Sequence, residues 1–300
     1  MITSNQNSLK KTFLNIATNI QIESNFCIIH PDYKPFSLPP LMAETLEKSS
    51  TVLQDKYLNL LLRNFLYGIY YNNSLQSVLA ANITNPNLLL HQDLENNCVF
   101  EIDWKFYNRL HEHNHGTGYL DEQWRVLRQE PDGSLAVTKN GLTLHIEENY
   151  LEPAALSSRV DDLIAIRLPK NRLNNGFYLA VSNSGKQQQN DIQNTWSDLE
   201  NTSIFFNVNY QGAIALMDSL TEKLNTAEIP FTFQVPHHPL GCDRHDSGIL
   251  NFQRQYYPVI QGLLKDIYAE HQAYFQPETP LFTKYLAPGL SLAEQPLEKP

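Results

Sequence analysis

The side chains best suited to chemistry in this sequence lie within one stretch, residues 111–146. The stretch combines alternate histidines, glycines and cations, in the order His111, His113, His115, Gly116, Gly118, Arg125 and Lys139. Glycine permits backbone conformations that other residues resist, so the turn at 116–118 can be sharp or can approach a ligand closely. Cationic side chains beside such a loop can hold an anion. We therefore expect an anion-binding site in this stretch.

Turn signals in the same stretch predict the element that positions these cations. The Asp-Gly pair at 132–133 is a strong hairpin signal, and Lys-Asn-Gly at 139–141 indicates a second hairpin. Residues 124–127, 135–137 and 142–146 then form a three-strand meander. We hypothesise that Arg125 and Lys139 project from one face of this meander toward the 116–118 loop. The structural alternative for Lys139 is an exposed lysine in a turn.

The composition indicates a soluble globular protein. The 300 residues are 42% hydrophobic and 18% charged, with a formal net charge of −10. This charge argues against non-specific binding of nucleic acid or of an anionic membrane. No apolar run approaches the roughly 20 residues of a membrane span, and the N-terminus lacks the apolar core of a secretory signal. Three widely spaced cysteines give no disulfide framework, so we expect a cytoplasmic protein with reduced thiols.

Residues 1–95 are predicted to form a helical N-terminal region. Apolar periodicity predicts helices over residues 9–22 and 57–71. The prolines between residues 31 and 40 predict a connector without extended regular structure. Residues 72–97 are rich in asparagine, glutamine and serine, and we expect one further short helix there.

Residues 96–300 are predicted to form a second domain that mixes strands and helices. Helices are predicted over 100–110, 212–224 and 255–275, and strands over 163–169, 176–181, 203–209, 230–235 and 248–252. We expect the strand at 163–169 to pair with that at 176–181, residues 184–198 to form an exposed loop, and the tail to pack back over the body. The fold class is therefore α+β, a helical N-terminal region followed by a mixed, largely antiparallel sheet flanked by helices.

An ordered set of motifs between residues 100 and 296 resembles the HopA effector-like family. The motifs are GTGYLDEQWRV, VTKNGLTL, AIRLPKN with GFYLAV, FFNVNYQGAIALMDSLTEKLN, IPFTF and TPLFTKYLAPGLSLAEQP. The family is named after a plant-pathogen type III secreted effector, and stand-alone members occur beside kinase-like partners in class V lanthipeptide and thioamitide pathways. The resemblance implies a phosphoserine or phosphothreonine lyase, which eliminates phosphate from a ribosomal precursor peptide and leaves a dehydroamino acid.

Elimination needs a base for the α-proton, cations for the phosphate and an acid for the departing oxygen. Candidate bases are Lys139, Lys170 and Lys284, and candidate acids are His115 and His245. Candidate phosphate ligands are Arg125, Arg167 and Arg244. Further candidate substrate contacts are Gly116, Thr117, Tyr119, Asn207, Asp246 and, again, Lys284. No metal or organic cofactor is required, and the expected partners are a phosphorylated precursor peptide and a kinase-like protein.

One departure from the family pattern bears on activity. Family members are expected to carry a lysine after the IPF strand, where this chain has Gln234. Loss of an essential lysine would leave a non-catalytic module that binds a peptide or partner protein, which is the second function that we consider.

The cations and histidines have other interpretations as well. Arg167 is suited to an ion pair at a strand end, and Lys284 to the surface of the C-terminal tail. Three alternate histidines on a strand could meet one zinc ion, which would favour a metal phosphohydrolase. The sequence contains no HExxH or CxxC motif, so we expect no metal.

Overall fold

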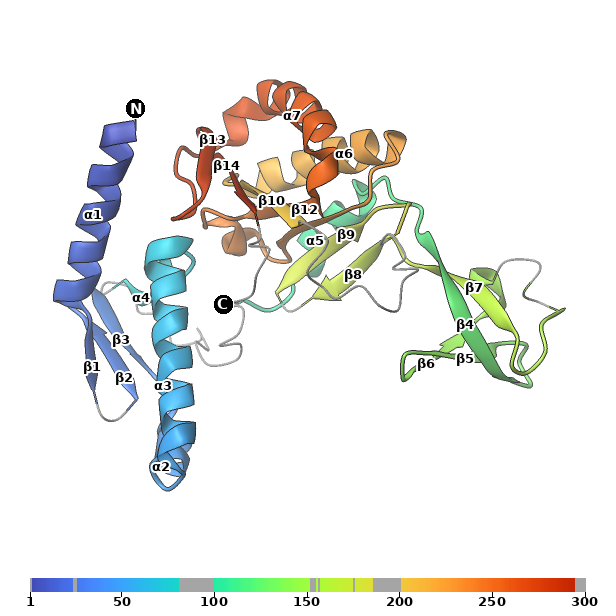
Figure 1. Cartoon of the computed structure of the whole chain (residues 1–300), viewed down its shortest axis with the longest axis horizontal. Coiled ribbons are helices and arrows are strands. Elements are labelled where there is room, and N and C mark those ends of the chain that lie inside the picture. The colour runs from blue at the N-terminus through green and yellow to red at the C-terminus, as the bar shows by residue number, and fades with distance from the viewer. Residues whose placement is uncertain are drawn as a thin grey trace.

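The computed structural model describes residues 2–23, 26–80, 100–151, 155, 157–174, 176–185 and 201–294, the side chains of residues 2–8 excepted. These residues form helices and three antiparallel sheets (Figure 1). The predicted α+β class is therefore confirmed. The predicted division near residue 95 falls among residues 81–99, outside the described ranges, and stays a prediction.

The N-terminal region combines helices with a small sheet. Its elements are α1 (Ile2–Asn19), β1 (Gln21–Glu23), β2 (Cys27–His30), β3 (Tyr33–Ser37), α2 (Pro40–Glu47), α3 (Thr51–Leu66), the π-helix η1 (Tyr67–Tyr71) and α4 (Gln76–Leu79). The predicted helices are confirmed, but the expected proline-rich connector is wrong, because β2 and β3 form a hairpin there. Pro35 is tolerated because β3 is an edge strand of the sheet order β1-β2-β3, and an edge strand can lack one ladder donor.

A buried histidine connects the elements of this region. Nδ1 of His30 accepts a hydrogen bond from the Asp32 backbone N–H at 3.1 Å. Its Nε2 lies 3.0 Å from the Tyr70 hydroxyl, which donates to Asn15 Oδ1 on α1 at 2.7 Å. Because Nδ1 accepts, it carries no proton, and His30 is neutral in this arrangement. Burial lowers the pKa of His30, and this effect outweighs the opposing effect of Asp32.

Acid is expected to destabilise the protein through His30. The unfolded chain binds a proton at the ordinary histidine pKa, whereas the folded chain binds it only at lower pH, so stability falls as the pH drops below that ordinary value. We expect the free energy of unfolding, measured by urea denaturation, to decrease between neutral pH and about pH 5. His30→Gln should flatten this slope. An unchanged slope in the variant would contradict the assignment.

The seven-stranded sheet, here called the central sheet, has the order β13-β14-β10-β12-β11-β9-β8. Its strands are β8 (Asn171–Asn174), β9 (Phe177–Val181), β10 (Asn201–Phe206), β11 (Phe231–Pro236), β12 (Gly248–Gln253), β13 (Lys284–Ala287) and β14 (Leu290–Glu294). The helices α5 (Trp104–Glu112), α6 (Tyr210–Thr226) and α7 (Tyr257–His271) contribute to the same hydrophobic core. The expected tail is thus the strand pair β13–β14 at one sheet edge.

In the middle of the central sheet, the residues that face these helices are buried. One row crosses six strands by direct pairing, in the order Leu292, Ile204, Leu250, Phe233, Ala180 and Asn171. The middle four side chains of this row have an exposed fraction of 0%. Paired residues share a face of a sheet, so the neighbouring rows of side chains point to the opposite face.

A third sheet, here called the meander sheet, lies at the end of the molecule far from α1 (Figure 1). It has the order β6-β5-β4-β7, from β4 (Tyr119–Gln129), β5 (Leu135–Lys139), β6 (Leu142–Ile146) and β7 (Leu163–Leu168). Its own core includes Trp124, Val137 and Ile166. Short one-turn helices elsewhere are η2 (Glu148–Tyr150), η4 (Pro239–Cys242), η5 (Arg254–Tyr256) and η6 (Gln272–Tyr274).

The predicted meander is confirmed, but one predicted pairing is wrong. The strand predicted over 163–169 is expected to pair with that over 176–181, whereas β7 pairs with β4, and β9 pairs with β8 and β11. Pro169 ends β7, and the short strand β8 that follows occupies the edge beside β9. The chain therefore changes sheets at Lys170. The loop predicted over 184–198 lies mostly outside the described residues.

Candidate functional site

The face of the central sheet opposite the helices, here called the open face, carries half-buried polar side chains among apolar ones. One of its rows joins Arg172, Leu179, Gln234 and Ile249 by direct pairing. Arg172 is exposed, and the other three side chains are half-buried. The adjacent row on this face contains the half-buried polar residues Thr232, Asn251 and Ser203. A partly accessible sheet face with converging polar groups is suited to a peptide rather than to a core.

Two arginines border the open face. Arg172 donates to the Tyr119 hydroxyl and lies over the Tyr119 ring, 5.8 Å from its centroid. Arg244 lies over the ring of Phe177, 5.2 Å from its centroid, and Phe177 shares a face with Leu179 by strand alternation. Sequence reasoning named Arg244 and Tyr119 but missed Arg172. Arg172 lies two residues after the candidate Lys170, but its place beside Leu179 depends on the strand β8, which the sequence did not predict.

Arg244 is held by a buried ion pair with Asp246. The guanidinium donates through Nε to Asp246 Oδ1 and through Nη2 to Oδ2, the latter at 3.1 Å. Asp246 is fully buried and also accepts from the Tyr67 hydroxyl at 3.3 Å and from Asn72 Nδ2 at 3.2 Å. Burial and the neighbouring carboxylate raise the pKa of Tyr67, so its hydroxyl stays protonated and can donate. The pair therefore joins the N-terminal region to the border of the open face.

Two further residues that the sequence predicts for the site are Asn207 and His245. Asn207 donates through Nδ2 to the Glu278 carbonyl at 3.0 Å, and its Oδ1 is buried without a hydrogen-bond partner. Burial lowers the pKa of His245, so this histidine is neutral near pH 7 and is a poor acid there. Neither arrangement tests their predicted roles.

A second polar cluster, the α5-end cluster, surrounds the end of α5. The Lys170 ammonium donates to the carbonyls of His111 at 3.0 Å and Asn114 at 2.8 Å. Burial lowers the pKa of Lys170. His115 Nε2 lies 2.8 Å from Asp218 Oδ1, and both side chains are about half exposed. A lysine with a lowered pKa near a histidine–carboxylate pair could exchange protons.

The glycine loop runs along this cluster, beside Lys170. Gly116 donates its N–H to Asn114 Oδ1 at 2.9 Å, and a Cβ added to Gly116 would lie 3.0 Å from Lys170 Cβ. Gly118 has a φ of +86°, and a Cβ there would collide with the Leu168 carbonyl oxygen. The Thr117 N–H donates to Asn183 Oδ1 at 2.7 Å. The loop is therefore packed tightly against residues 168–170.

The expected common face of Arg125 and Lys139 is wrong. Arg125 pairs with Thr138, so the next residue, Lys139, points to the opposite face. Lys139 donates to Asp121 Oδ1 at 2.9 Å and to the Glu122 carbonyl at 2.7 Å, beside the Trp124 ring. The ammonium of Lys139 is therefore bound within the meander sheet. A structural role fits this lysine better than the role of a catalytic base. The one-residue alternation of β5 decides this separation.

The other predicted cations lie apart from one another. Arg167 is exposed on β7, in the meander sheet. Lys284 begins β13 and continues the row that ends at Asn171. Six strand spacings of about 4.8 Å place these two sheet edges about 29 Å apart. Lys284 and Lys170 therefore cannot contact one small ligand in a single chain.

Metal and membrane interpretations find no support in the described residues. Within them, no group of three or more histidine, cysteine, aspartate or glutamate side chains could hold a metal ion. His113 Nδ1 lies 2.8 Å from the Arg109 carbonyl, so this histidine is used locally at the end of α5. None of the described helices is both long and apolar enough to cross a membrane. Cys27 and Cys242 are buried free thiols, and Cys98 lies outside the described residues.

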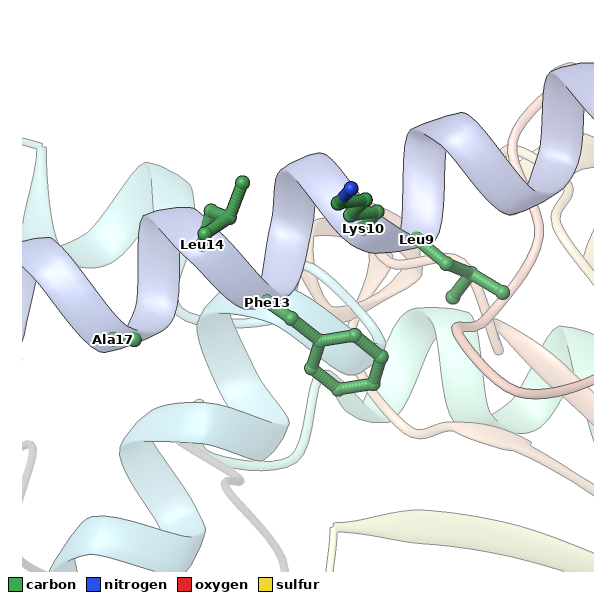
Figure 2. Close-up of a pocket in the computed structure, with 5 residues that line it drawn as sticks. All are labelled: Leu9, Lys10, Phe13, Leu14 and Ala17. Carbon is green, nitrogen blue, oxygen red and sulfur yellow. The ribbon is translucent and has the colours of Figure 1, made fainter.

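A pocket on α1 is separate from both polar clusters. It is lined by Leu9, Lys10, Phe13, Leu14 and Ala17 (Figure 2). The Phe13 ring contacts Phe282 with 5.7 Å between centroids. Apart from Lys10, this lining offers no side chain that could act as an acid, base or nucleophile, so it does not supply the pair of groups that elimination needs.

Together these features define a class of protein: an α+β chain with a polar sheet face bordered by arginines. Residues 168–300 match the model of the HopA1 effector protein family. The resemblance predicted from the sequence is therefore confirmed. No curated protein matches the chain.

Two solved structures of effector proteins are similar to this chain. The effector protein from Pseudomonas syringae pv. tomato strain DC3000 shares 16% identity at a TM-score of 0.36, over 65% of this chain and 63% of that one. The effector protein from Pseudomonas syringae pv. syringae strain 61 shares 15% identity at a TM-score of 0.35, over 85% of this chain and 75% of that one. The chain thus spans less than two thirds of the tomato-strain effector.

Proposed function

We propose that this protein is a HopA1-type module that binds a phosphorylated peptide on the open face without eliminating its phosphate. The observation that carries the proposal is the place of Gln234. It lies in one row with Arg172, at the position where the family resemblance implies a lysine. An arginine can hold a phosphate through two parallel hydrogen bonds, whereas glutamine cannot remove an α-proton as a lysine can.

The other lysine candidates support the same proposal by their positions. Lys139 belongs to the meander sheet, and Lys284 lies at the far edge of the central sheet. Lys170 reaches away to the carbonyls at the end of α5. Among the described lysines that were predicted as bases, none contacts the row of Arg172 and Gln234. Recognition of the phosphate therefore fits this face better than its elimination.

Binding tests the proposal directly. A fluorescein-labelled peptide with one phosphoserine is expected to bind more tightly than its unphosphorylated form. Arg172→Gln should weaken the phosphopeptide complex about tenfold or more, because a hydrogen bond to a charged group contributes about 1.5–3 kcal/mol. Lys284→Gln makes the same charge change at the opposite sheet edge and should leave the affinity unchanged. Equal affinity for the two peptides would overturn the proposal.

A second candidate function is the phosphoserine/phosphothreonine lyase that the resemblance implies, acting on a precursor peptide beside a kinase-like partner. The lowered pKa of Lys170 and the His115–Asp218 pair favour it. Lys170 would take the α-proton, the Cα–H electrons would form the Cα=Cβ bond, and the Cβ–O bond would break. Phosphate would leave with the electron pair of the Cβ–O bond, and His115 would protonate it.

Mass spectrometry of the same phosphopeptide separates the two functions. We expect no mass change in the peptide after incubation with the protein. Loss of phosphoric acid, abolished by Lys170→Met, would favour the lyase instead. Loss of only the phosphoryl group, which restores serine, would indicate hydrolysis and would contradict both candidates.

A further inference from the structure

The outer face of the meander sheet carries a group of cations outside the open face. Arg125 pairs with both Thr138 and Leu163, so these three side chains share a face. Arg128 pairs with Ala136, which in turn pairs with His145. Arg167 pairs with Leu120 on the same face. Three arginines and one histidine therefore lie on a single face of four strands.

This face is accessible. The exposed fractions of the Arg125, Arg128 and His145 side chains are 57%, 61% and 57%. Leu120 and Leu163, which lie between the cations, are 45% and 58% exposed. The opposite face of the same sheet buries its apolar residues in a separate core. Among the described residues, the outer face is thus an exposed amphipathic surface at the end of the molecule seen in Figure 1.

The charge of this face is opposite to that of the chain. The protein has a net charge of −10, yet the paired strand positions of this face include no carboxylate. Two carboxylates at its border contact it. Asp161 lies 3.7 Å from Arg125, and Glu130 lies 2.7 Å from Arg128 and 3.5 Å from His145. These contacts show that Arg125 and Arg128 on this face bind carboxylates.

We propose that the outer face of the meander sheet docks an acidic peptide segment of a partner. Carboxylates along an extended segment would pair with the arginines, and its apolar side chains would cover Leu120 and Leu163. A single-stranded nucleic acid fits less well, because the paired strand positions of this face include no aromatic ring for base stacking. The face is built separately from the row of Arg172 and Gln234, so acidic docking does not depend on the proposed phosphopeptide recognition.

Fluorescence anisotropy tests the docking with two labelled probes, a peptide of alternating glutamate and leucine spaced by serine, and oligothymidine. The peptide is expected to bind, and its affinity should fall with added salt. The variant with Arg125→Gln, Arg128→Gln and Arg167→Gln should bind it at least about tenfold more weakly, since each exposed ion pair contributes modestly. The control with Lys105→Gln, Arg109→Gln and Lys265→Gln, exposed positions on α5 and α7, should bind normally.

Three results would overturn the docking proposal. They are no binding of the peptide, equal loss in the two triple variants, and tighter binding of oligothymidine than of the peptide. If circular dichroism shows that the sheet variant has lost its fold, the single variants Arg125→Gln and Arg128→Gln replace it, and each must still weaken the peptide complex. The glutamate–leucine peptide contains no phosphate. Its binding therefore tests the docking proposal separately from the proposed phosphopeptide recognition on the open face.

Discussion

Replacement of Asp246 with alanine is expected to lower the free energy of unfolding by about 3–5 kcal/mol, the usual effect of breaking a buried ion pair on one side. Asp246 is fully buried and Arg244 is 7% exposed, so water cannot replace the lost carboxylate. The variant leaves the guanidinium charge buried over Phe177. It also removes the acceptor of the Tyr67 hydroxyl and of Asn72. Urea denaturation followed by circular dichroism measures the change.

An exposed ion pair supplies the matched control. Glu44 on α2 and Lys48, the residue that follows this helix, lie 2.7 Å apart, with side chains 62% and 73% exposed. Glu44→Ala should change the stability by about 0–1 kcal/mol, because water screens the pair and replaces it. If Asp246→Ala destabilises the protein no more than Glu44→Ala does, the ion pair has no structural role at the border of the open face.

Replacement of Gln234 with lysine is expected to confer phosphate elimination on a protein that, as proposed above, binds the phosphopeptide without this reaction. The lysine would stand on β11 in the row of Arg172 and supply the missing base. Positioned acid–base groups accelerate reactions by about 100-fold to 10000-fold. The rate of phosphoric acid loss, followed by mass spectrometry, should rise by a factor in this range above background.

A second position on the same strand gives the control for this gain. Thr232 shares the open face with Gln234 but lies one row away from Arg172. Thr232→Lys adds the same charge and should not confer elimination. Equal activity of the two variants would show that added charge, rather than the position of a base, is responsible. No gain from Gln234→Lys, with phosphopeptide binding intact, would contradict the assignment of this position.

Local sequence patterns determined most of the elements. The apolar periodicity of residues 57–71, 212–224 and 255–275 predicted α3, α6 and α7, because a helix with one buried face needs that spacing. The Asp-Gly and Asn-Gly turns predicted β4, β5 and β6 for a similarly local reason. The family resemblance was also carried by ordered local motifs. The proline-rich segment misled because a prolyl residue is compatible with an edge strand, and being an edge is not a local property.

Only the tertiary structure decided which side chains meet. Strand pairing over long separations placed Arg172 beside Leu179 and Gln234, and the same pairing put Lys284 at the far edge. The alternation of β5 separated Lys139 from Arg125, since one residue along a strand reverses the face. Sequence shows which residues could act as bases or bind anions. Their convergence depends on sheet order and register, which arise from contacts between distant segments.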